Sequence, residues 1–243
     1  MKNKKIDKTP ARLDFIQSAT GLILAVFIMG HLLFEASILI SNEAMYKMTI
    51  FFEGYYFFGE TYPGIITFLA AAVSVIFILH ILTAIRKFPA SYRKYKIMRN
   101  HMSTMKHEDT SLWMVQVITG FMMFFTASVH LYIMMSQPSN IGPYASSARI
   151  VDEFMGPLYL VLLVSVVFHA FVGLYRLAVK WGFMEGKNSK VSRKRFKITM
   201  YVLIAFYLII GLASLAKYTY IGMTHDFADG ERYKSKTIIM EQH

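Results

Sequence analysis

Four of the eight histidines lie inside long apolar stretches of the sequence: His31, His80, His130 and His169. A single histidine inside a membrane helix more often makes a hydrogen bond to a neighbouring helix, but ionisable groups there are costly and are therefore functional candidates. A helix rises 1.5 Å per residue, so depth can be counted from the basic end of each stretch. His31 and His130 lie roughly 24 and 28 Å from that end, and His80 and His169 roughly 9 to 10 Å. This spacing predicts two pairs, each at its own depth.

Two histidines on facing helices at equal depth can ligate the iron of a b-type haem from both sides, without covalent attachment. With both axial positions filled, electron transfer is favoured over oxygen binding. Zinc would require a third or fourth ligand, and no Cys, Asp or Glu accompanies both pairs. The chain has no cysteine, which excludes disulfides, thiolate-ligated clusters and covalent c-type haem. The predicted chemistry is electron transfer through two stacked haems.

The elements that must hold these histidines are five apolar runs, each long enough to cross a hydrocarbon core of about 30 Å as a helix. Of the 243 residues, 55% are hydrophobic and 17% are charged, which argues against an ordinary water-soluble fold. We therefore predict an all-α integral membrane bundle that forms one domain over residues 1–243. Its five transmembrane helices are expected at about 15–40, 64–86, 111–136, 156–180 and 198–221.

The charges alternate between the connections of these runs. Twenty of the 26 Lys and Arg residues lie in the N-terminal tail, in the second and fourth connections and in the helix ends that lead into them. Together these segments carry a net charge of +15, against −4 for the rest of the chain. Basic loops stay in the cytoplasm, so the N-terminus is expected inside and the C-terminus outside. The total of +11 is therefore explained by topology and the membrane lipid, and a nucleic-acid partner is not expected.

Four segments carry a resemblance to a known family: LDFIQSATG (13–21), HILTAIRKFPASYR (80–93), HEDTSLWMVQVITGFMMFFTASVHLYIMM (107–135) and FVGLYRLAVKWGF (171–183). Together they resemble the dihaem cytochrome b membrane-anchor subunit of fumarate reductase, in the succinate:quinone oxidoreductase family. The resemblance runs from about residue 11 to about residue 220 and includes the spacing of all four histidines.

The resemblance implies two haem b groups, an inner one on His80 and His169 and an outer one on His31 and His130. It also implies an iron–sulfur partner subunit, a flavoprotein bound through it that interconverts fumarate and succinate, and a quinone, expected to be menaquinone. The dicarboxylate site would then lie on another chain. The location implied is the bacterial cytoplasmic membrane, and the role is in anaerobic respiration. A dimer of the whole complex is compatible with this assignment.

Several further residues match family positions around the cofactors. The resemblance implies that Gln17, Ser18, Trp113 and Lys180 hold the propionates of the inner haem, which suits their donor groups. Without it, Lys180 could equally extend its charge to the interface, and Trp113 could belong to the interfacial aromatic belt. Arg149 is a weaker match to a polar contact near the outer haem.

The outer connection contains Glu53 within TIFFEGYYFFGE, at the family position of the carboxylate that acts in quinol oxidation. A carboxylate beside aromatic rings could accept a proton as a quinol loses electrons. The alternative is a solvated loop acid. We expect Glu53 to be the catalytic residue of this chain.

Two positions concern the direction of the reaction. Some family members carry a glutamate two residues before the inner haem ligand of the fourth helix, thought to carry protons alongside electrons, and here that residue is Val167. Electrons moving inward from menaquinol would then move against the membrane potential, which favours succinate oxidation instead. Glu35, four residues after His31, could substitute as a proton carrier or simply reach the outer interface.

Two other assignments remain open at this point. A dihaem cytochrome b of a hydrogenase or a formate dehydrogenase would share the histidine pattern and the quinone chemistry, but would bind another soluble partner. A non-redox transporter or plain anchor, in which the histidines relay protons, belongs to a different class and would contain no haem.

Overall fold

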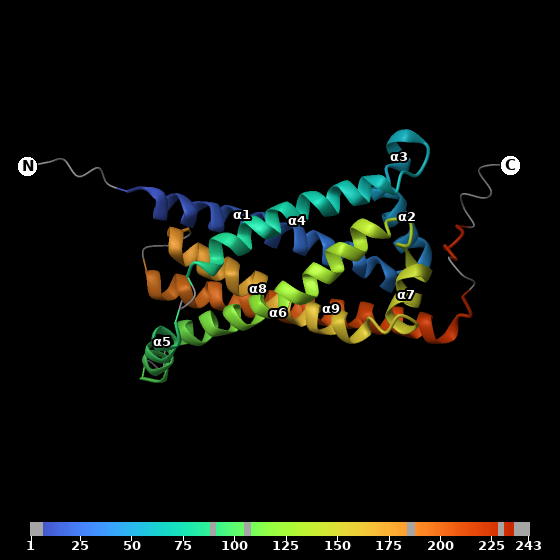
Figure 1. The fold of residues 1–243 in the computed structure, drawn as a ribbon. Helices are drawn as coiled ribbons and strands as arrows, with labels where there is room; N and C mark the ends of the chain where they lie inside the picture. Colours follow the sequence, from blue (N-terminus) through green and yellow to red (C-terminus); the bar gives the residue numbers. More distant parts are fainter. Residues whose placement is uncertain (1–6, 88–90, 105–107, 184–187, 228–230, 236–243) are drawn as a thin grey trace, which may run out of the picture.

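The computed structural model describes residues 7–87, 91–104, 108–183, 188–227 and 231–235, and this part of the chain contains helices but no strand. Five of the helices are long and apolar enough to cross a membrane. They are α1 (Thr9–Glu35), α4 (Gly64–Ile85), α6 (Glu108–Ser136), α8 (Gly156–Trp181) and α9 (Ser189–Thr224). The predicted all-α fold with five spanning helices is therefore confirmed (Figure 1).

The last of these helices begins nine residues before the apolar run that predicted it. Asn188 caps its N-terminus, since the side chain of Asn188 accepts a hydrogen bond from the backbone N–H of Val191 at 3.3 Å. The basic residues that follow are good helix formers and continue the helix beyond the apolar segment. Hydropathy alone marks only the part of α9 that lies in lipid.

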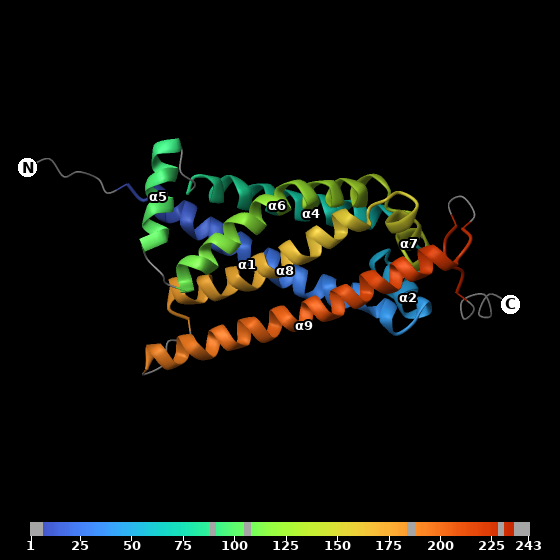
Figure 2. The same cartoon turned by 90° about the horizontal axis from the view of Figure 1, so that it is seen from below.

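Four of the spanning helices form a ring, in which α1 packs against α4, α4 against α6, α6 against α8, and α8 against α1. Each helix of this ring carries one of the four intramembrane histidines. The fifth helix, α9, lies outside the ring and packs mainly on α8 (Figure 2). Helices on the two diagonals, α1 with α6 and α4 with α8, therefore face each other across the centre.

The best-buried span is α8, which lies between the ring and α9. Its side chains Val167 and Phe171 are buried in an apolar cluster with Tyr207 of α9. By contrast, α4 exposes Phe68 and Leu82 over most of their surface. Large apolar side chains exposed along a helix of this length match a surface that contacts lipid.

Short helices lie at both ends of the bundle. One of them, η1, continues the first predicted apolar run, and the others occupy connections in which the sequence analysis predicted no helix. At one end of the bundle lie η1 (Ala36–Leu39), α2 (Asn42–Phe52), α3 (Tyr55–Phe58), α7 (Pro143–Val151) and the C-terminal segment. We call this the far end. At the opposite end, which we call the basic end, lie the start of α1, α5 (Tyr92–Thr104), the end of α8 and the start of α9. The first and last described residues, 7 and 235, lie at opposite ends of the bundle, as five spans require; which end faces the cytoplasm is predicted from charge alone.

Candidate functional site

The structure brings the four histidines together in the two pairs that depth predicts. The rings of His80 and His169 lie with their centroids 6.3 Å apart at 87°, and those of His31 and His130 lie 6.1 Å apart at 51°. A metal ion between two imidazoles, bonded to each at about 2 Å, requires a separation of this size. In the described part of the chain no three His, Asp or Glu side chains form a metal-ion site. Each pair thus fits the two axial ligands of a haem.

In the histidine pair that lies nearer the basic end, each ring contacts a threonine hydroxyl. Thr20 donates its hydroxyl to the carbonyl of Ile16 at 2.8 Å, and Thr119 donates to the carbonyl of Val115 at 2.7 Å. Their oxygens lie 3.2 and 3.4 Å from Nδ1 of His80 and His169, respectively. Since each hydroxyl proton is already donated, the oxygen accepts the ring N–H, which leaves Nε2 deprotonated. That tautomer can bind a metal.

The same five-residue pattern builds both of these contacts. Residues 17–21 read QSATG on α1, and residues 116–120 read QVITG on α6. The backbone carbonyl of Gln116 also accepts from Nδ1 of His169, at 2.9 Å. The glycines matter because a Cβ on Gly21 or Gly120 would lie 2.9 Å from Cε1 of the facing histidine ring. This short internal repeat was missed in the sequence analysis, although it could have been found there.

The pair nearer the far end has different surroundings. His31 stacks on Phe27, at 5.6 Å between ring centroids, and the ring of Tyr159 stands edge-on to His130 at 5.7 Å. In the described part of the chain, Nδ1 of His130 is buried without a hydrogen-bond partner. Arg149 is also buried, and its Nη2 donates to the carbonyl of Asn140 at 2.7 Å while its Nε has no partner. A buried guanidinium with an unused N–H fits a carboxylate such as a haem propionate.

A cluster of charges lies at the basic end beside the His80–His169 pair. Lys180 contacts Asp14 at 3.1 Å and the hydroxyl of Ser18 at 3.5 Å, while Arg86 and Lys87 also pair with Asp14. Asp14 thus holds three cations together, a role that the sequence analysis did not assign to it.

Two other predicted propionate contacts lie at the same end. In the described part of the chain, Oε1 of Gln17 is buried without a partner. Trp113 is half-buried in the second turn of α6. The cations around Asp14 fit the carboxylates of a haem at this depth, whereas the unpartnered atom of Gln17 is an acceptor and gives a carboxylate no donor.

At the far end, Glu53 directly follows α2 as its C-cap residue and is fully buried. Its Oε1 accepts a hydrogen bond from Nη2 of Arg232 at 2.5 Å, and its Oε2 has no partner in the described part of the chain. Burial raises the pKa of the Glu53 carboxyl, and the charge and the hydrogen bond of Arg232 oppose that rise. The neighbouring ring of Phe52 packs on Phe34, three residues after His31, at 5.0 Å. Glu53 is therefore a buried carboxylate near the end of α1, not a solvated loop acid.

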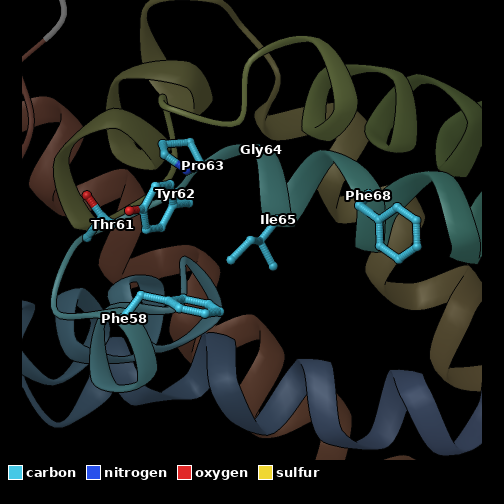
Figure 3. A pocket seen from close by; sticks show the side chains of 7 residues that line it. All are labelled: Phe58, Thr61, Tyr62, Pro63, Gly64, Ile65 and Phe68. Carbon is cyan, nitrogen blue, oxygen red and sulfur yellow. The ribbon is translucent and has the colours of Figure 1, made fainter.

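An apolar groove of about 650 Å³ opens beside the turn that carries Glu53 (Figure 3). The backbone N–H of Tyr62, which lines the groove, donates to the carbonyl of Glu53 at 2.8 Å. Figure 3 shows Phe58 at one side of the groove, with Ile65 and Phe68 along α4. A groove with this lining can take a flat apolar ring from the lipid.

Glu35 has a protein partner at the far end. The hydroxyl of Tyr218, a buried residue of α9, donates to Oε2 of Glu35 at 3.0 Å. The Glu35 carboxylate therefore links α1 to α9 and is half-buried.

Comparison with known proteins extends over most of the chain. Residues 92–211 match the family described as succinate dehydrogenase/fumarate reductase transmembrane subunit. The chain is 46% identical over 220 residues to the fumarate reductase cytochrome b subunit of Wolinella succinogenes, which covers 90% of this chain and 86% of that protein. It is 45% and 46% identical over 213 residues to the proteins of the same name from two strains of Helicobacter pylori, covering 88% of this chain and 82% of each.

Proposed function

Since this chain belongs to the family of fumarate reductase cytochrome b subunits, we propose that it is the dihaem membrane anchor that passes electrons between quinone and a soluble partner. The resemblance seen in the sequence is confirmed by this membership, which also argues against the cytochromes of hydrogenases and formate dehydrogenases and against a transporter. The observation that carries the proposal is the pair of diagonal histidine contacts, at 6.3 and 6.1 Å.

In the proposed arrangement, His80 and His169 hold the inner haem b, and His31 and His130 hold the outer one. Bound haem supplies a one-electron carrier at each depth. Thr20 and Thr119 fix the tautomer of the inner histidines through Nδ1. The cations around Asp14, together with Gln17, Ser18 and Trp113, neutralise and bind the inner propionates, and Arg149 serves the outer haem.

At the far end, we propose that a quinone, expected to be menaquinone, reacts beside Glu53. Oxidation of a quinol to a quinone releases two electrons and two protons, so a base must accept protons there. Oε2 of Glu53 accepts no described hydrogen bond. Burial raises the pKa of the Glu53 carboxyl towards neutral pH, where a general base transfers protons efficiently. The groove lined by Phe58 and Phe68 gives the ring a path from the lipid.

The basic end would face the cytoplasm and bind an iron–sulfur subunit, which carries electrons to a flavoprotein with the dicarboxylate site. This chain contains no cysteine, so it cannot hold an iron–sulfur cluster on thiolates. The complex would reside in the bacterial cytoplasmic membrane. Co-purification after solubilisation, followed by assays with succinate and fumarate, tests this part of the proposal.

A reduced-minus-oxidised visible spectrum of the purified complex, with haem quantified per chain, tests the ligand assignment. We expect two b-type haems per chain. His80→Ala and His169→Ala should each remove the same haem, and His31→Ala and His130→Ala should each remove the other. His101→Ala, outside the spans, should remove neither. No b-type signal, or a full signal when His80 and His169 are both replaced, would contradict the assignment.

A further inference from the structure

The described residues beyond α9 include a short segment, 231–235, that lies across the far end of the bundle beside α2 and α7 (Figures 1 and 2). We call this segment the C-terminal strap. The hydroxyl of Ser235 donates to Oε1 of Glu43 on α2 at 2.5 Å. The ring of Tyr233 packs on Tyr46 of α2 at 5.6 Å. The strap is therefore joined to α2, the helix that Glu53 directly follows.

A second set of contacts joins the strap to α7 and to the end of α9. The ring of Tyr233 meets Tyr144 of α7 at 5.2 Å. His225, which follows α9, stacks on Tyr144 at 4.2 Å and lies 3.3 Å from the carboxylate of Glu231. Contacts on both sides of Arg232 thus fix the backbone from which its side chain extends.

Arg232 reaches from the strap to the buried end of α2. Its Nη2 donates to Oε1 of Glu53 at 2.5 Å, across 179 positions of sequence. The Arg232 side chain is one-third exposed, whereas that of Glu53 is wholly buried. Burying a carboxylate is very unfavourable unless a partner compensates its charge. Arg232 supplies that compensation to one oxygen and leaves the other, Oε2, without a described partner.

We infer that Arg232 is a positioning residue for Glu53: it keeps the buried carboxylate ionised and fixes Oε1, so that Oε2 faces the quinol as the proton acceptor. The inference rests on the proposed role of Glu53 at a quinone site. Arg232 itself does not take the proton, because a guanidinium stays charged at physiological pH. The strap therefore belongs to the quinone site, although it lies outside the helices that hold the histidines.

Arg232 is the described cation that pairs with Glu53, and the neighbouring ionisable groups do not replace it. Tyr46 interacts electrostatically with Arg232, Glu53, Glu43 and Tyr55, and burial raises the pKa of Tyr46, so this phenol is neutral beside the ion pair. At the same end, the charged side chains of α1 and α7 have other partners. These are Glu35, bonded to Tyr218, and Arg149, bonded to Asn140.

The test replaces Arg232 in the whole complex. Arg232→Gln should lower fumarate reduction by a soluble menaquinol analogue about tenfold or more at pH 7, because a general base contributes ~10²-fold or more to such a step. The acid limb of the pH profile should move to higher pH, since the pKa of Glu53 loses the influence that opposes its rise. Fumarate reduction by a reduced viologen, which supplies electrons to the soluble subunits directly, should be unchanged, as should the haem spectrum.

Two variants on the strap serve as controls. Lys234→Gln removes an exposed charge from the same segment and should match the wild type in every assay. Arg232→Lys keeps a cation near Glu53 and should restore most of the quinol activity and return the acid limb towards that of the wild type. If Arg232→Gln loses haem, the test depends on Arg232→Lys. The inference is overturned if Arg232→Lys retains all its haem but the acid limb of its pH profile stays shifted from that of the wild type.

The remaining outcomes separate this inference from the proposed function. Glu53→Gln should abolish most quinol-dependent turnover, and adding Arg232→Gln to it should cause no further loss, because Arg232 acts through Glu53. If Glu53→Gln is inactive while Arg232→Gln behaves as the wild type, the inference is wrong and the proposed quinone site stands. If Glu53→Gln is fully active, the quinone site itself is wrongly placed.

Discussion

The hydroxyls of Thr20 and Thr119 are the nearest side-chain partners of the ring nitrogens of His80 and His169 shown in this structure. Replacing either threonine with valine keeps the shape of the side chain but removes a hydroxyl oxygen that accepts Nδ1–H; at His169 the carbonyl of Gln116 still accepts the same N–H. Loss of such a partner typically weakens metal binding about 10- to 100-fold. We expect Thr20→Val and Thr119→Val to lower the affinity of the inner haem and to shift its reduction potential, leaving the outer haem unchanged. Redox titration followed by visible absorbance measures both effects.

The matched control for this prediction is Thr219→Val. Thr219 donates its hydroxyl to the carbonyl of Leu215 at 2.8 Å, so it makes the same bond within a helix, but it lies on α9 outside the ring. Its replacement should leave both haems intact. If it perturbs the inner haem as much as Thr20→Val does, the effect comes from the helices and not from the histidine contact.

Gly21 and Gly120 give the second prediction at this scale. Each allows a histidine ring to approach the backbone of the neighbouring helix, and an added Cβ would lie 2.9 Å from Cε1 of the ring. The ring cannot yield without leaving the position proposed for a haem ligand. We therefore expect Gly21→Ala or Gly120→Ala to cause loss of the inner haem, measured as haem per purified chain. Gly64→Ala, which meets nothing within 4 Å, should retain both haems.

Among the elements, α9 stabilises the ring without supplying a histidine. A Cβ on Gly211 would lie 2.5 Å from Cδ1 of Leu163, so close packing of α9 on α8 requires glycine there. We expect Gly211→Ala to destabilise the protein by roughly 1–3 kcal/mol, as overpacking usually does, with the haem spectrum unchanged at low temperature. Thermal unfolding in detergent, followed by loss of the haem absorbance, measures the change.

The second variant for this contact is Leu163→Ala. Alone it leaves a cavity and should also destabilise. Combined with Gly211→Ala it provides room for the added methyl group, so the double variant should be more stable than the sum of the two losses predicts. If the losses of stability in the two single variants simply add in the double variant, the two positions are not in steric contact and the prediction is wrong.

The spanning helices were predictable because each is marked by a long apolar run, a signal that local sequence carries in full. The connections were not. Within α2, α3 and α7 the sequence has no run of that length; α2 and α7 pack on the ends of the spans, and α3 packs on α2. The start of α9 was missed for a related reason, since its first turns are basic and solvent-facing.

The candidate site, too, was predictable from the sequence only in part. The histidine pairs followed from depth, which needs only the helix rise. The partners of the ligands did not, because Thr20 lies 60 residues from His80, and Arg232 lies 179 residues from Glu53. The sequence analysis assigned no role to Asp14, whose contact with Lys180 spans 166 residues. Contacts of that separation depend on how the helices are arranged in the bundle.

For the molecule as a whole, Val167 bears on the direction of electron flow. It is fully buried in the apolar cluster between α8 and α9 and cannot take up a proton. Moving one charge across a potential of 100 mV costs about 2.3 kcal/mol. In the proposed orientation, electrons passing inward from quinol to fumarate move against the potential, and those passing outward from succinate to quinone move with it. Without a proton that travels alongside, the potential therefore favours succinate oxidation.

We expect collapse of the potential in energised vesicles, with valinomycin and potassium, to slow quinone reduction by succinate about twofold or more. The same treatment should accelerate fumarate reduction by quinol. Nigericin, which removes the pH gradient and keeps the potential, should do neither. This contrast matters because a protonophore alone would not separate charge movement from proton supply.

Insensitivity of both reactions to valinomycin would contradict the prediction and would require a proton to accompany each electron. Glu35 would then be the candidate carrier, since it is a half-buried carboxylate held by Tyr218 and lies four residues after His31. In that case Glu35→Gln would make both reactions sensitive to the potential, whereas Tyr218→Phe would keep the carboxylate and remove only its hydrogen bond. Sensitivity already present in the wild type, and unchanged in Glu35→Gln, would leave Glu35 with the structural role of joining α1 to α9.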